Sequence, residues 1–335
     1  MTKRNPFLDI VKAACILFVI ITHDKISESF RLKTLFPFWI NMAVPMFMII
    51  SGYVYAISFE RNKISEIHEA YALNFIMPKF IRYTVPFILA YLVELADEIF
   101  IRHNYSVASW IFHFFNGGIG PGSYYYPVLL QFLFIYPVIY FVVRRYDFKG
   151  LLLCFAMNAV FEFFQRVWGC GGGFYRMLMF RYIFVIAFGS WLYQRKEKTS
   201  AIWKIFSFAV GVIFIILYCY LKVKPKIIIY WTATCFLACL YLLPIADFLI
   251  TKTHISCKPA ELLGKASFNI FLSQMVYFNY MVGFVRKIIP VHIFQLLAHI
   301  GICVISGLLF YFIEQKITKW VLKMWRSEKR MLLKK

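Results

Sequence analysis

The chain has 335 residues, of which 61% are hydrophobic and only 16% are charged, and its mean hydropathy is +0.69. A soluble domain has about 25% charged residues, because its helices keep a polar face toward water. The 37 Lys and Arg residues outnumber the 16 Asp and Glu residues. These cations lie beside apolar segments, which favours membrane topology and contacts with anionic lipids over nucleic-acid binding. The composition excludes a soluble or disordered chain and predicts a multi-pass protein of the cell membrane.

About ten apolar segments are long enough, or nearly so, to cross a bilayer, which takes about 20 residues. These predicted spans run over residues 8–23, 39–58, 80–101, 124–143, 149–165, 177–193, 202–221, 227–249, 266–284 and 292–313. Their connections are short, so the sequence predicts one all-α membrane domain over residues 1–335. An even number of spans places both termini on one side. That side holds about 24 Lys and Arg residues against about 11 on the other, which predicts cytoplasmic termini.

The first predicted span carries ionisable side chains, which are costly inside a bilayer and therefore indicate function. Lys12 and His23 are eleven residues apart, so they share one helix face about 16 Å apart along the axis. Asp9 lies one turn before Lys12. His23 is the natural general base, and Asp24 beside it is predicted to tune it. Alternatively, Asp9 and Lys12 are a boundary ion pair and His23 only ends the helix.

Five short motifs follow one another in order along the chain. They are Lys12 with His23 after ten intervening residues, Val44-Pro45 leading to Ser51-Gly52-Tyr53, Pro78-Lys79-Phe80-Ile81-Arg82, Leu263-Gly264-Lys265-Ala266-Ser267-Phe268-Asn269-Ile270-Phe271-Leu272, and Phe312-Ile313-Glu314. This order resembles the acyltransferase-3 family of membrane O-acyltransferases over nearly the whole chain, as a member without a fused SGNH domain. The chain departs from the family pattern at Tyr126-Pro127-Val128, where Trp-Phe-Leu is frequent, and at Gln274, near a frequent His.

The resemblance implies transfer of an acyl group, usually acetyl, from cytoplasmic acetyl-CoA or another acyl-CoA to a hydroxyl of a surface polysaccharide or its lipid-linked precursor. CoA is then a substrate, and no permanently bound cofactor is expected. Lys79 and Arg82 share a helix face and would bind the CoA phosphates together with Lys12; alternatively, the pair contacts lipid headgroups. Pro78 would occupy the first turn of that helix. His23 would accept the acceptor proton or form an acyl-His intermediate, and both routes stay open.

Two further charged sites are predicted to contact the sugar. Glu94 forms an acidic helix face with Asp97 and Glu98, which is alternatively a solvated boundary, and Arg181 lies within a span, where it alternatively pairs with a carboxylate. Ser51-Gly52 favours close helix packing over a nucleophile. The histidines show no metal-ligand spacing, so no metal site is predicted. A rival function of another class is a transporter that exports a polysaccharide or its precursor without chemistry, since charges within spans suit both.

Overall fold

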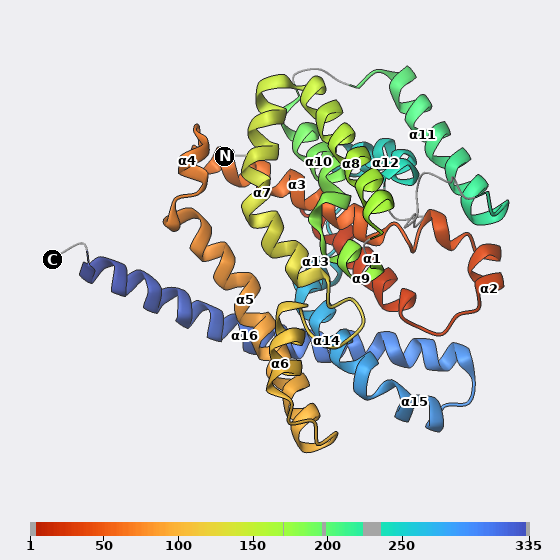
Figure 1. Cartoon of the computed structure of the whole chain (residues 1–335), viewed down its shortest axis with the longest axis vertical. Helices are drawn as coiled ribbons and strands as arrows, with labels where there is room; N and C mark the ends of the chain where they lie inside the picture. The colour runs from red at the N-terminus through yellow and green to blue at the C-terminus, as the bar shows by residue number, and fades with distance from the viewer. Residues whose placement is uncertain (1–4, 170, 196–198, 224–235, 333–335) are drawn as a thin grey trace. The chain divides into compact units, whose positions relative to one another are not determined.

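The computed structural model describes residues 5–169, 171–195, 199–223 and 236–332 (Figure 1). Every regular element in these four ranges is a helix, which confirms the all-α prediction for this part of the chain. Residues 227–235, the beginning of the eighth predicted span, lie outside the described ranges.

The chain divides into two compact units. The first unit consists of Met1–Ala70 and Phe134–Lys265, and the second consists of Tyr71–Leu133 and Ala266–Lys335. Helix α7 (Tyr125–Tyr146) begins in the second unit and ends in the first. Of the residues with predicted roles, the first unit holds Lys12, His23, Asp24 and Arg181, and the second holds Lys79, Arg82 and Glu94. The prediction of one domain over residues 1–335 stays a prediction.

The first unit is built on α1 (Phe7–Thr22), α3 (Ala43–Arg61) and α10 (Ile183–Gln194). Helix α3 packs along α10 and also contacts α1, which packs along α13 (Lys258–Lys265). The first ten residues of α10 are all buried, so this helix is in the core of the unit. The other helical segments of this unit are α2 (Glu28–Lys33), η1 (Phe36–Phe38), α4 (Ile67–Ala70), α8 (Phe148–Trp168), α9 (Gly172–Met177), η2 (Met179–Tyr182), α11 (Ala201–Ile215), η3 (Ile216–Tyr220), η4 (Phe236–Tyr241) and α12 (Leu242–Lys252).

Two glycines let α3 and α10 approach closely. A Cβ added to Gly52 would overlap the carbonyl oxygen of Ile186, and one added to Gly189 would overlap that of Ile49. The hydroxyl of Tyr136 in α7 donates a hydrogen bond of 2.8 Å to the carbonyl of Gly52. The motif that contains Gly52 therefore serves close helix packing, in agreement with the sequence prediction.

The second unit pairs α14 (Ser267–Tyr280) with α16 (His292–Leu332), and α5 (Leu73–Phe100) packs against both. A Cβ added to Gly307 in α16 would lie 2.5 Å from the Cα of Ile270 in α14, so these two helices also cross at close range. The remaining helices of this unit are α6 (Val107–Phe115) and α15 (Val282–Ile288), which bends by 65° from α14.

Within the described ranges, six helices are long and apolar enough to cross a membrane, or seven if the bent α14–α15 pair is one span. They are Phe36–Arg61, Ile67–Phe100, Tyr125–Tyr146, Phe148–Gln165, Ala201–Tyr220 and His292–Ser327. The chain is therefore a multi-pass membrane protein. Ten spans and cytoplasmic termini stay predictions. The 16 residues of α1 reach only about 24 Å at 1.5 Å per residue, less than the roughly 30 Å of a hydrocarbon core.

Helix α5 begins earlier than the sequence predicted. It starts at Leu73, so Pro78 is an internal residue and not a first-turn residue, and the prediction of a first-turn proline is wrong. The apolar run from Phe75 to Met77 continues the helix upstream of the proline, with Ile76 buried. Pro78 lacks the N–H that would bond to the fourth residue before it, a defect that membrane helices tolerate when neighbouring groups satisfy the carbonyl.

Candidate functional site

Helix α1 carries an ion pair near its beginning and an imidazole at its end. The ammonium of Lys12 lies 2.9 Å from a carboxylate oxygen of Asp9, whose side chain is only 2% exposed. The helix is continuous to Thr22, and His23 caps it, donating its backbone N–H to the carbonyl of Ile20 at 3.2 Å. The His23 side chain is half-buried. The ion pair considered as an alternative therefore exists, and it leaves the imidazole about three turns away along the same helix.

Helix α2 returns toward the end of α1, where Arg31 binds the backbone around His23. A terminal nitrogen of the Arg31 guanidinium, Nη2, donates to the carbonyls of Thr22 at 3.3 Å and Asp24 at 3.1 Å. Asp24 is 3% exposed, and its carboxylate accepts the backbone N–H of Lys25 at 2.8 Å. These bonds hold the residues on both sides of His23 in one geometry. The tuning of His23 by Asp24 stays a prediction.

Sequence reasoning did not select Arg31. It lies eight residues after His23, in a polar connection where a cation predicts only a solvated boundary. Arg31 binds the backbone around His23 only because α2 folds back against the end of α1, and no motif or spacing in the sequence predicts that contact.

Arg181 lies in η2 and is 4% exposed. Its guanidinium carbon is 5.0 Å from the ring centre of Tyr175 and 4.6 Å from that of Tyr182. The carboxylate of Glu162 in α8 accepts the hydroxyl of Tyr175 at 2.6 Å and lies close enough to Arg181 for their charges to interact. The structure therefore favours the alternative of a carboxylate partner from another helix. A sugar contact by Arg181 stays a prediction.

Lys79 and Arg82 are adjacent on one face of α5. Lys79 is half-buried, and its ammonium lies over the ring of Phe75, 2.9 Å from the ring centre, whereas Arg82 is exposed. The two cations therefore share a helix face, as the sequence predicted. Their binding of CoA phosphates stays a prediction.

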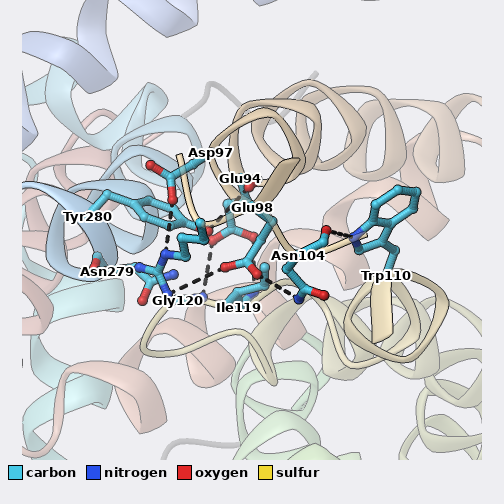
Figure 2. A network of polar contacts seen from close by, with 10 residues as sticks. Glu94, Asp97, Glu98, Asn104, Trp110, Ile119, Gly120, Asn279 and Tyr280 are labelled. Atoms are coloured by element: carbon cyan, nitrogen blue, oxygen red, sulfur yellow. Dashed lines mark hydrogen bonds and ion pairs between the residues drawn. The ribbon is translucent and has the colours of Figure 1, made fainter. Parts of the chain in front are cut away.

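Glu94 in α5 anchors a glycine-rich loop. Its side chain is 2% exposed and accepts the backbone N–H of Ile119 at 2.9 Å and of Gly120 at 3.1 Å. Figure 2 shows its carboxylate directed at this loop, which joins α6 to α7 over residues 116–124. Gly118 in the loop has a φ of +113°, and a Cβ there would lie 2.7 Å from a carboxylate oxygen of Glu94. Glu94 thus holds this loop in place. A contact between Glu94 and sugar hydroxyls stays a prediction.

Arg102 pairs with two carboxylates of the acidic face that contains Glu94. The guanidinium lies 3.0 Å from Asp97 and 3.4 Å from Glu98, and it donates to the carbonyl of Asn279 at 3.4 Å. Asn104 donates to Glu98 at 2.9 Å. Glu98 is only 6% exposed, whereas the Arg102 side chain is 42% exposed, so the network is buried at Glu98 and reaches the surface at Arg102.

Two of the sequence motifs meet between α14 and α16. The amide of Asn269 donates to Glu314 at 3.2 Å, and the hydroxyl of Thr318 also bonds to Glu314. Gln274, which stands near a histidine position of the family pattern, is fully buried, and its amide nitrogen and oxygen have no hydrogen-bond partner within the described ranges. Glu314 is therefore bound by helix contacts, whereas Gln274 keeps unused hydrogen-bonding capacity.

A family model described as an acyltransferase domain, that of the acyltransferase-3 family, matches residues 5–313. The match covers nearly the whole chain, and the chain therefore belongs to this family. No curated protein and no solved structure matches the chain. Together with its membrane-crossing helices, the family identifies the protein as a multi-pass membrane acyltransferase.

Proposed function

We propose that the protein transfers an acyl group, acetyl in the simplest case, from cytoplasmic acyl-CoA to a hydroxyl of a cell-surface polysaccharide or of its lipid-linked precursor. The observation that carries this proposal is the half-buried His23 at the end of α1, in a backbone turn that Arg31 braces on both sides. Membership of the family supports the acyl transfer. The CoA donor and the glycan acceptor are those that the sequence resemblance implies.

His23 would act as the general base. The acceptor hydroxyl oxygen attacks the thioester carbonyl carbon, His23 takes the hydroxyl proton, the C–S bond breaks, and the proton passes to the CoA sulfur. An imidazole suits both proton transfers because its unperturbed pKa lies near neutrality. In the covalent variant, His23 first attacks the thioester itself and then passes the acyl group to the hydroxyl.

Lys12 on α1 would bind donor phosphates, and the sequence resemblance implies the same role for Lys79 and Arg82 on α5. Phosphate oxygens form strong hydrogen bonds with cations, and an ammonium has three donors, so the pairing of Lys12 with Asp9 does not use all of them. Lys12 and His23 are separated by about 16 Å along α1, a distance that an extended pantetheine arm spans. The acyl group would then reach His23 while the phosphates stay near Lys12.

Anionic membrane lipids are the proposed partners of the basic end of α16. Four exposed cations, Lys316, Lys319, Lys323 and Arg326, fall within an arc of about 80° on this helix. Helix α16 has 41 residues and is about 60 Å long, so this end extends beyond a hydrocarbon core of roughly 30 Å. Each cation near an anionic surface contributes about 1 kcal/mol.

The decisive experiment compares His23→Ala with His68→Ala by NMR of the host surface glycan. His68 is a control because its side chain is 74% exposed and because it lies far from His23 in the sequence. We expect His23→Ala to lower acyl transfer by at least about 10²-fold, in the range of general-base catalysis, with unchanged protein level and polymer export. His68→Ala should keep the ester signal.

The same experiment separates the rival transporter. If His23→Ala stops polymer export while the ester content per sugar stays normal, the protein exports a glycan and the acyltransferase proposal is wrong.

A further inference from the structure

Arg31 presents a buried, unused donor beside His23. Its Nη2 is occupied by the carbonyls of Thr22 and Asp24, the residues immediately before and after His23. Its Nε is buried and has no hydrogen-bond partner within the described residues. The guanidinium is therefore fixed by one nitrogen while another N–H is left without an acceptor.

The surroundings of this guanidinium increase its electrostatic effect. The guanidinium carbon lies 5.7 Å from the ring centre of Phe36, a residue that is only 3% exposed. Arg31 and His23 lie close enough for their charges to interact. A cation fixed next to an apolar side chain acts more strongly on a nearby charge than it would in water, and it needs no reorganisation during a reaction.

A charged donor without an acceptor is unfavourable in a buried site, because it loses its water and gains no replacement. A bound group that brings an acceptor oxygen would remove this deficit. In acyl transfer from a thioester, the acceptor oxygen that gains negative charge is the thioester carbonyl oxygen.

We propose that Arg31 is a catalytic residue whose Nε–H donates to the thioester carbonyl oxygen of the acyl donor while His23 takes the proton of the acceptor hydroxyl. This assignment rests on the proposed function and adds the residue that stabilises the negative charge. As the hydroxyl oxygen bonds to the carbonyl carbon, the C=O electron pair moves to the oxygen held by Arg31. When the C=O bond re-forms, the C–S bond breaks, and the proton on His23 passes to the CoA sulfur.

The first test measures the kinetics of acyl transfer by purified protein with Arg31→Lys, Arg31→Gln and the control Lys33→Gln. Lys33 is an exposed cation in the same last turn of α2. Loss of an oxyanion donor typically lowers kcat by about 10²–10³-fold. We expect a decrease of this size for both Arg31 variants, together with a rise of about tenfold in the KM for acyl-CoA, because the same contact also binds the carbonyl of the unreacted donor. Lys33→Gln should have near-normal kinetics.

The second test separates contact with the carbonyl from support of the turn. It compares the affinities of two unreactive donors, S-acetonyl-CoA, which has a ketone oxygen, and S-ethyl-CoA, which has none. We expect the wild-type protein to bind the ketone at least about tenfold more tightly, and Arg31→Lys and Arg31→Gln to bind both equally. Loss of a merely structural role would weaken both analogues by the same factor, so an unchanged affinity ratio overturns the assignment.

The two proposals fail in different ways. If the wild-type protein transfers acyl groups from acyl-CoA but Arg31→Lys keeps its kcat or its affinity ratio, only the Arg31 assignment is wrong. If the wild-type protein transfers no acyl group from acyl-CoA, the proposed function is wrong and the Arg31 assignment is overturned with it.

Discussion

The His23 corner, formed by His23, Asp24 and Arg31, and the network around Glu94 both bring an arginine close to a carboxylate-bearing residue. They differ in how many of their charged groups have hydrogen-bond partners. In the Glu94 network, Arg102 has two carboxylate partners and a backbone carbonyl. Glu94 has two backbone donors, Ile119 and Gly120 (Figure 2). In the corner, Arg31 is bound only through carbonyls, and its buried Nε has no partner within the described residues.

This difference shows why charge within a membrane protein does not by itself identify a site. A charged group whose hydrogen bonds are all made within the fold stabilises the fold, whereas one with unused buried capacity is available to a ligand. From this comparison we propose that the Glu94 network stabilises the fold and that the residues around His23 carry the chemistry. Variants of the Glu94 network should then lower stability, and variants around His23 should lower activity.

The largest expected effect on stability comes from Glu94→Ala. This change leaves the half-buried N–H of Ile119 and the buried N–H of Gly120 without their acceptor, and the loss of a buried acceptor costs about 1–3 kcal/mol. We expect the free energy of unfolding in detergent to fall by about 2–4 kcal/mol, measured by thermal and denaturant unfolding. Protein that stays folded should keep its KM for acyl-CoA.

Glu94→Gln sharpens this comparison because the amide keeps one acceptor oxygen. It should lose less stability than Glu94→Ala. A variant of Glu94 with normal stability and a raised KM for the glycan would instead support the sugar contact that the sequence predicted, and would contradict a purely structural network.

A smaller effect is expected from the cations of α5. Lys79→Ala and Arg82→Ala should each raise the KM for acyl-CoA by about tenfold, or about 1.4 kcal/mol, with the KM for the acceptor unchanged, because each removes a phosphate contact. Initial-rate kinetics with both substrates varied would measure this. Lys149→Ala removes an exposed cation elsewhere and should change neither KM. Equal changes in both KM values would argue against phosphate binding.

The smallest effect is expected from Asp97→Asn at the edge of the Glu94 network. Its partner Arg102 is 42% exposed and keeps the contact with Glu98, so the free energy of unfolding should fall by less than about 1 kcal/mol. Chemical unfolding of this variant beside Glu94→Ala would measure the contrast between the edge and the buried centre. A loss as large as that of Glu94→Ala would show that the network stabilises the fold as one unit.

The sequence by itself determined the membrane class, the helical fold and the family. These follow from composition, from apolar run length and from short motifs in order, all of which are local properties of the chain. The same local geometry placed Lys12 and His23 on one helix and Lys79 beside Arg82. It misplaced the beginning of α5, because a proline is typical of a first turn and is also tolerated inside a membrane helix.

Only the tertiary structure decided which charged groups are satisfied. Glu94 binds a loop that begins more than twenty residues later, Glu162 reaches Tyr175 from another helix, and Arg31 returns to the carbonyls around His23. Hydrogen bonds depend on positions within a few tenths of an ångström, and no residue spacing specifies where two separate helices will meet. For that reason the sequence did not show that Glu94 binds a loop of its own chain, and it did not single out Arg31.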